Sequence, residues 1–118
     1  MAQTYIVGDI VVYKNRIHTI IDTLGLNNYE LSYIRNPVNR AELSGVPLTP
    51  EILEKNGWRK EEENYFNDSY HIFLECNYEK YSAYKVVHNN VVWLRDVRSV
   101  SDLQHLLYGL EINHEMEV

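Results

Sequence analysis

The stretch LTPEILEKNGW, Leu48–Trp58, decides the middle of the fold because it carries a complete set of helix start and stop signals. Thr49 is a typical N-cap residue, and Pro50 suits the first helical position, where its missing N–H has no intrahelical partner to lose. The pattern predicts a helix of about two turns over 50–56. Because so short a helix is marginal alone in water, its apolar residues must pack on a neighbouring sheet.

The end of this helix is signalled as clearly as its start. Gly57 suits the left-handed conformation that follows many helix C-termini. Trp58, one residue further on, is expected to close back on Leu53, which is the apolar contact that accompanies a Schellman motif.

The sequence before this helix predicts strands. Three runs rich in β-branched, aromatic or alternating residues cover 10–13, 17–21 and 29–34, and residues 14–16 form a short hairpin connection between the first two. We therefore expect an N-terminal SH3-like antiparallel sheet, or half-barrel, over residues 1–45. The stretch 35–47, punctuated by two prolines and a glycine, is predicted to be a loop.

The sequence after the helix returns to a period of two. One face of a predicted strand carries Tyr70, Ile72, Leu74 and Cys76. This alternation places Cys76 in the core. Further strands at 65–66, 81–87 and 91–94, the last two joined by a tight connection at 88–90, complete a four-stranded antiparallel β-meander.

Apolar residues at helical spacing predict a C-terminal amphipathic helix. They are Val100, Leu103, Leu106, Leu107 and Leu110. Ser99 or Ser101 is the expected N-cap, the latter with Gln104 as its capping-box partner. The helix should fray near Glu111 and leave a mobile acidic tail. The whole chain is thus predicted to be one α+β domain, 1–118, with a β half at 1–45 and a helix, meander and helix at 46–118.

Charge is distributed unevenly along the chain. The net charge is −6; residues 1–60 hold seven basic and six acidic side chains, whereas residues 61–118 hold four basic and eleven acidic ones. A net negative chain starts at a disadvantage in binding phosphates. A local nucleic-acid-binding patch remains an alternative, formed by Lys14, Arg16, Arg35 and Arg40. The run 61–63, three glutamates, suggests as a third possibility an acidic mimic of nucleic acid.

Residues that usually carry catalysis, metal or cofactor binding do not form a recognisable pattern. The five histidines and the single Cys76 lack metal-ligand spacing, and the five glycines are too dispersed for a phosphate-binding loop. We therefore predict no catalytic, cofactor or metal residue. One cysteine cannot form an intramolecular disulfide, and the N-terminus lacks a signal-peptide pattern, so the expected compartment is the cytoplasm, with no membrane insertion.

Aromatic content is the one unusual feature of the composition. The chain has ten tyrosines and two tryptophans, more than a core of this size can hold at its centre. Tyrosine and tryptophan are enriched at recognition surfaces. We expect a protein-binding face on the second sheet, formed by Tyr78, Tyr81, Tyr84 and Trp93. The same rings beside Arg35 and Arg40 would instead stack bases of a single strand.

The segments Val46–Trp58 and Val100–Leu110 resemble a family of small uncharacterised proteins from Bacteroidota genomes, phages and mobile elements. The similarity extends in order from a Gly-Asp-x-Val opening at Gly8, through the Pro-Leu-Thr-x-Glu-Ile-Leu-Glu-Lys-x-Gly-aromatic centre, to a C-terminal Leu-Gln-x-Leu-Tyr type of helix. The chain departs from the family at Gly109, where relatives continue the helix. The resemblance implies a cytoplasmic, mobile-element context rather than a reaction.

These observations favour a non-enzymatic protein-interaction module, a small cytoplasmic accessory protein of phage or mobile-element origin that binds another protein or itself. The alternative is a nucleic-acid-binding accessory protein that uses the N-terminal sheet. An acidic mimic comes third and an enzyme last.

Overall fold

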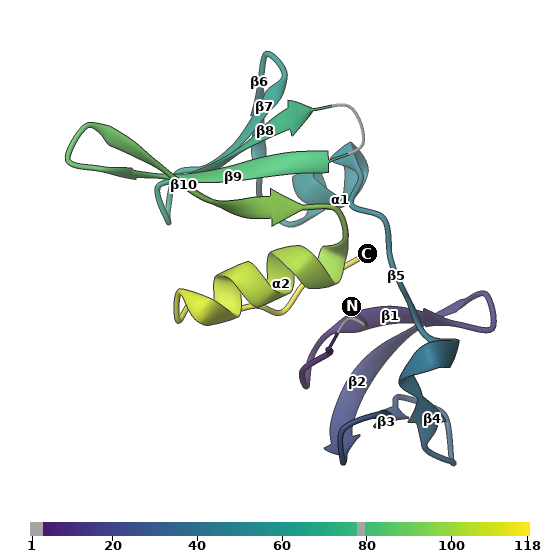
Figure 1. The fold of residues 1–118 in the computed structure, drawn as a ribbon. Coiled ribbons are helices and arrows are strands. Elements are labelled where there is room, and N and C mark those ends of the chain that lie inside the picture. Colours follow the sequence, from purple (N-terminus) through teal and green to yellow (C-terminus); the bar gives the residue numbers. More distant parts are fainter. Residues whose placement is uncertain (1–3, 78–79) are drawn as a thin grey trace. The chain divides into compact units, whose positions relative to one another are not determined.

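The computed structural model describes residues 4–77 and 80–118, which form two compact units (Figure 1). The first unit contains residues 4–47 and 99–116, and the second contains residues 48–77, 80–98 and 117–118. The C-terminal helix, which we grouped with the second half of the chain, belongs to the first unit. Each unit is described separately below. The α+β class is confirmed, with two antiparallel sheets and two α-helices.

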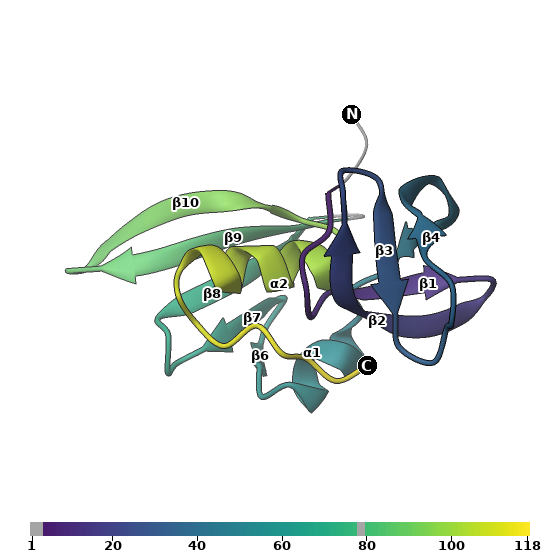
Figure 2. The same cartoon turned by 90° about the horizontal axis from the view of Figure 1, so that it is seen from below.

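The first unit is built on a five-stranded sheet of order β4-β3-β2-β1-β5 (Figure 2). Its strands are β1 (Ile10–Tyr13), β2 (Arg16–Leu24), β3 (Asn28–Leu31), β4 (Val38–Asn39) and β5 (Ser44–Gly45). Lys14 and Asn15 form the β1–β2 turn with φ of 48° and 64°, the left-handed pair that a tight hairpin requires. The expected hairpin is confirmed. The sheet is open, so the described residues do not close into a barrel.

The expected loop at 35–47 contains more structure than its prolines and glycine suggest. It includes β4, a 3-10 turn, η1 (Arg40–Glu42), and β5. Asn39 caps that turn, since its side-chain oxygen accepts a hydrogen bond from the Ala41 N–H at 2.9 Å. The prediction was wrong here because two-residue strands give no detectable alternation.

The apolar stripe of the C-terminal helix α2 (Val100–Gly109) is buried. Its capping box joins Ser99 to Asp102, rather than Ser101 to Gln104. Gln104 is instead fully buried, where its side chain accepts a hydrogen bond from the Ile10 N–H and donates one to the Gly8 carbonyl, both at strand β1 or just before it. This amide therefore anchors the helix to the start of strand β1.

A buried carboxylate lies beside the same helix. Asp9 is fully buried, and its Oδ2 accepts hydrogen bonds from the Ile6 N–H at 2.9 Å and from His105 Nε2 at 2.5 Å. Its Oδ1 has no hydrogen-bond partner. A buried charge of this kind needs its partners, because an unpaired one is strongly destabilising.

The acidic tail after α2 is held at several points. Leu110 forms the C-cap. The Gln104 side chain, which also donates to the Gly8 carbonyl, donates a hydrogen bond to the His114 carbonyl. Within the second unit, Glu117 exchanges hydrogen bonds with the Asn56 side chain at 2.9 and 2.7 Å. The helix ends near the expected residue. The prediction of a mobile acidic tail is contradicted where these hydrogen bonds hold residues 114 and 117.

The second unit is a five-stranded meander of order β10-β9-β8-β7-β6. Its strands are β6 (Arg59–Glu61), β7 (Asn64–Asn67), β8 (Ile72–Asn77), β9 (Lys80–Val87) and β10 (Asn90–Val97). The sequence predicted only four, because the charged segment that forms β6 reads as a polar link. Left-handed His88 and Asn89 make the tight β9–β10 turn, as expected.

Helix α1 (Pro50–Lys55) has the predicted start and stop. Thr49 Oγ1 accepts a hydrogen bond from the Ile52 N–H at 3.3 Å. At the other end Gly57 has φ +87°, and the Trp58 N–H donates to the Leu53 carbonyl at 3.0 Å, which is the Schellman bond. Leu53 and Trp58 are both buried, so the helix packs on the sheet as its length demands.

One face of the meander forms the core of the second unit. Ile72 and Leu74 are buried on it, as predicted, but Cys76 is exposed. Cys76 lies one residue before the end of β8, beyond the buried part of the strand. Alternation alone does not show where along a strand burial stops.

Candidate interaction surface

The other face of the meander carries a continuous row of aromatic side chains. The cross-strand register pairs Phe66 with Phe73, Phe73 with Tyr84, and Tyr84 with Trp93. Directly opposed residues of antiparallel strands project from the same face. These four residues, one from each of β7, β8, β9 and β10, are called the aromatic row below.

Three of the four rings of the aromatic row, those of Phe66, Phe73 and Tyr84, stack in sequence. The Phe66 and Phe73 centroids lie 5.4 Å apart with an interplanar angle of 28°, and those of Phe73 and Tyr84 lie 5.0 Å apart at 17°. At the β6 end, the Arg59 guanidinium covers Phe66 at 5.2 Å from the ring centroid. Stacking fixes the rings at low entropic cost, so they form a rigid, partly exposed surface.

A row of polar and acidic side chains runs parallel to the aromatic row on the same face. The register joins them across all five strands in the order Glu61, Asn64, Glu75, Ser82 and Asp96. Lys80 Nζ lies 2.8 Å from Asp96, and this hydrogen bond lowers the pKa of that carboxyl. The three carboxylates of this set, Glu61, Glu75 and Asp96, are called the acidic row.

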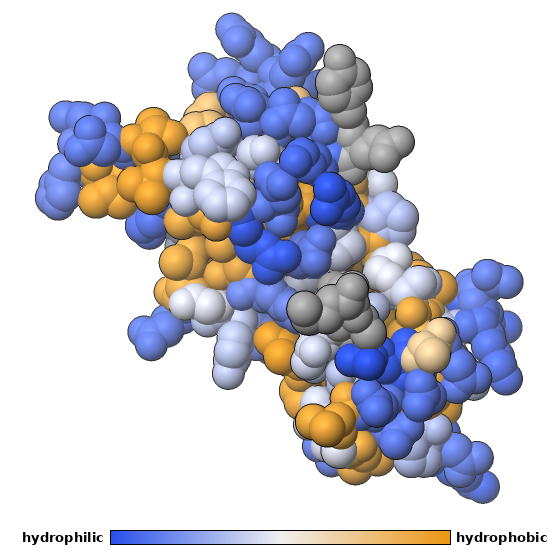
Figure 3. Space-filling view, viewed as in Figure 1, coloured by the Kyte–Doolittle hydropathy of each residue, from blue (hydrophilic) through white to orange (hydrophobic). Residues whose placement is uncertain are grey.

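The β9–β10 hairpin extends the apolar surface beyond the aromatic row. Val86 and Val91 oppose each other next to Trp93, and Val91 and Trp93 are each 57% exposed. Figure 3 shows apolar side chains gathered over this hairpin. β10 is also the edge of the sheet, and residues 90–94 contain no charge, proline or glycine. Edges of this kind are usually blunted in proteins that act alone.

The structure separates the tyrosines that the sequence grouped together. Tyr84 and Trp93 lie in the aromatic row. Tyr81 is only 8% exposed, on the opposite face, with its ring packed edge-on against Tyr65 at 6.2 Å. It is three residues from Tyr84, and an odd separation puts two strand residues on opposite faces. Tyr78 lies outside the described residues.

Sequence reasoning missed Phe66 and Phe73. The signal that finds them is cross-strand register, because each residue occupies the position opposite the next ring along the sheet. Neither stands out alone, since Phe73 is one of several large residues in an ordinary alternating strand.

The four basic residues proposed for nucleic-acid binding all belong to the first unit, not to the unit that carries the aromatic row. Lys14 and Arg16 flank the β1–β2 turn, where Lys14 Nζ lies 5.3 Å from the centroid of the Tyr13 ring. Arg35 is exposed in the loop after β3, and Arg40 is half-buried at the start of η1. They are spread over three places in this unit: the β1–β2 turn, the loop after β3, and η1.

The three adjacent glutamates lie at the β6–β7 hairpin, and all are exposed. Glu61 is paired with Arg59 at 2.6 Å, and Arg59 also contacts Asp68, whose pKa it lowers by hydrogen bonding. Glu62 takes the left-handed conformation of the turn with φ 57°. With Glu75 they make this end of the face acidic.

The residues that the structure describes form no metal site and no helix that could span a membrane. No group of three His, Cys, Asp or Glu residues could hold a metal ion there. None of the described helices is long and apolar enough to cross a membrane. No family model, curated protein or solved structure matches the chain.

Proposed function

We propose that this chain is a non-enzymatic protein-interaction module that binds an extended segment of another protein on the aromatic row and the adjoining β10 edge. The supporting observation is the pairing of two features on one face: a stacked, partly exposed aromatic row and a parallel acidic row. Tyrosine, tryptophan and phenylalanine supply large contact area with few rotatable bonds.

The two rows define the chemistry of the partner. A strand added beside β10 gains main-chain hydrogen bonds, and its alternate side chains reach the aromatic face. Apolar or aromatic residues suit Trp93 and Tyr84, while lysine or arginine suits the acidic row. We therefore expect a partner segment with an apolar and a basic residue two positions apart, because residues i and i+2 of an extended segment project from the same face.

Single-stranded nucleic acid is the competing partner because bases also stack on exposed rings. The acidic row argues against it, since Glu75 would repel a phosphate backbone. Glu61 and Asp96 are paired with Arg59 and Lys80, so these two cations are already engaged. The alternative binding of nucleic acid by the SH3-like N-terminal sheet would use Lys14, Arg16, Arg35 and Arg40. A cytoplasmic accessory role in a phage or mobile element remains part of the proposal through the family resemblance.

The test is selection of peptides from a random extended-peptide library, with binding of a single-stranded oligonucleotide measured in parallel. We expect enriched peptides to carry an apolar and a basic residue two positions apart. They should bind with a Kd that rises at least about tenfold in Trp93→Ala, as loss of an aromatic anchor does. The matched control is Tyr33→Asn, which removes a fully exposed ring from the first unit. Asparagine tolerates the left-handed conformation of Tyr33, φ 64°.

Three results would contradict this proposal. The first is that enriched peptides lack basic residues, and the second is that their affinity is equal in the Trp93 and Tyr33 variants. The third is that the oligonucleotide binds tightly while peptides do not. In the last case, loss of binding in Arg35→Ala or Arg40→Ala would support the alternative partner.

A further inference from the structure

Two adjoining hollows in the first unit share one set of polar residues. The larger has a volume of about 640 Å³ and the smaller about 440 Å³. Tyr5, Asn27 and Arg40 line both of them. Volumes of this size suit small ligands.

The backbone of Arg40 is fixed by its surroundings. Its N–H donates to the Asn27 carbonyl at 2.7 Å, and its carbonyl accepts from the Leu43 N–H at 3.1 Å. Its guanidinium, by contrast, has no hydrogen-bond or ion-pair partner among the described residues. Because the Arg40 side chain lines both hollows, its N–H donors are open to a ligand there.

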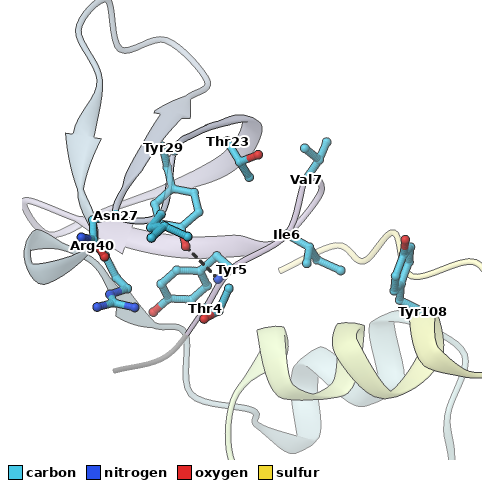
Figure 4. A pocket seen from close by; sticks show the side chains of 11 residues that line it. Thr4, Tyr5, Ile6, Val7, Thr23, Asn27, Tyr29, Arg40 and Tyr108 are labelled. Carbon is cyan, nitrogen blue, oxygen red and sulfur yellow. Dashed lines mark hydrogen bonds between the residues drawn. The ribbon is translucent and has the colours of Figure 1, made fainter. Parts of the chain in front are cut away.

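The neighbouring polar groups are also unused. The Tyr5 hydroxyl and the Asn27 side-chain amide make no hydrogen bond with any described residue. Burial raises the pKa of Tyr5, with Asp9 adding to the shift, so the phenol keeps its proton and remains a donor at neutral pH. Figure 4 shows Arg40, Asn27 and the Tyr5 hydroxyl at the same end of the larger hollow.

The charge of the residues that line the two hollows favours an anionic ligand. Among the described residues that line the two hollows, Arg40 is the only charged one, and none is acidic. A guanidinium matches the oxygens of a carboxylate or phosphate in a bidentate arrangement. The shared end of the hollows is thus an oxyanion site with up to three kinds of donor.

The rest of the larger hollow is mainly apolar. Figure 4 shows Ile6, Val7 and Tyr108 toward its far end, with the Tyr5 and Tyr29 rings between them and Arg40. Tyr29 is fixed in place, since its hydroxyl accepts a hydrogen bond from the Tyr5 N–H at 3.1 Å and its ring packs edge-on against Tyr5 at 5.7 Å. Such walls suit an apolar or aromatic group.

We infer that the first unit binds a small molecule that carries an anionic oxygen group, a carboxylate or a phosphate monoester, on an aromatic body. Arg40, Tyr5 and Asn27 hold the anionic group, and the body lies along the apolar part toward Tyr108. The site belongs to a different unit from the aromatic row and is independent of the proposed protein interaction.

The test is an NMR titration of the full chain with benzoate and with phenyl phosphate, which together identify the preferred anion. Two compounds serve as controls. Phenol has the aromatic ring without the anionic group, and inorganic phosphate has the anionic group without the ring. We expect one aromatic anion to give saturable amide shifts at Tyr5, Asn27 and Arg40, and to bind more tightly than either control.

Variants locate the binding. Arg40→Gln should raise the Kd at least about tenfold, because a charge-assisted hydrogen bond is lost. Arg35→Gln removes an exposed arginine of the same unit that does not line the hollows, and should change the Kd less than about twofold. Tyr108→Ala, at the far end, should weaken the aromatic anion without affecting inorganic phosphate.

Several results would overturn the inference. One is the absence of a saturable shift with either aromatic anion. Another is that phenol binds as tightly as the aromatic anions, or inorganic phosphate as tightly as phenyl phosphate. The last is that a folded Arg40→Gln variant keeps the affinity of the wild type.

Discussion

Removal of His105 should destabilise the first unit more than neutralisation of Asp9. In His105→Leu the buried Asp9 carboxylate keeps only the Ile6 N–H as a donor, since its Oδ1 already lacks a partner. Breaking a buried pair by removing one partner costs about 3 to 5 kcal/mol. The His105 side chain is 22% exposed, so water relieves part of this cost, and we expect about 3 kcal/mol.

Asp9→Asn keeps the size of the side chain and an oxygen that still accepts from Ile6 and His105. It loses the charge assistance of these bonds, which corresponds to about 1 to 2 kcal/mol. Its amide nitrogen takes the place of Oδ1, so one buried polar atom lacks a partner in both proteins. In the Asp9→Asn background the stranded charge no longer exists. His105→Leu should then cost less than it does in the wild type, with a coupling of at least about 1 kcal/mol.

The assay is urea unfolding followed by far-UV circular dichroism, together with the amide signals of the first unit in NMR spectra. The site-resolved signals are needed because both tryptophans, Trp58 and Trp93, lie in the second unit. Additivity of the two substitutions within about 0.5 kcal/mol would refute the reasoning. So would a cost for Asp9→Asn larger than that for His105→Leu.

Two further predictions concern backbone conformation and alkaline stability. Gly57→Ala should lower the free energy of unfolding by about 1 kcal/mol, because Gly57 has a positive φ. Gly109→Ala should raise it by about 0.5 to 1 kcal/mol, because this glycine is helical and has open space around it. Equal effects of the two substitutions in urea unfolding would contradict this. Burial raises the pKa of Tyr5, Tyr65 and Tyr81 above the ordinary value of 10.0. The unfolded chain therefore loses these protons first, and stability, fully present below about pH 10, should fall as the pH rises further. Spectroscopic titration should show some tyrosines ionising only together with unfolding, and titration of all ten near pH 10 in the folded chain would contradict this.

Local signals in the sequence predicted local structure well. The caps of α1, the Schellman bond from Trp58, and the tight turns after Tyr13 and Val87 each depend on a few adjacent residues, and each is confirmed. The two-sheet α+β arrangement was also predictable, because strand and helix periods alternate along the chain.

Features that depend on distant residues were not predictable from one sequence. Strand β6 has no apolar alternation, and its charged residues form a strand only because β7 supplies its hydrogen-bond partner. The aromatic row requires the register of four strands. Gln104, an unremarkable polar residue in sequence, is buried because its amide bonds the backbone at Gly8 and Ile10. Tyr81 and Tyr84 are close in sequence but belong to opposite faces.

The proposed interaction is tested most directly by mapping a selected peptide onto the chain with amide and aromatic NMR signals. We predict that the shifted signals are those of Phe73, Tyr84, Trp93 and the residues of the β10 edge, with the ring signals most affected. Shifts confined to the first unit, or to residues on the buried face such as Tyr81, would contradict the assignment of the aromatic row as the binding surface.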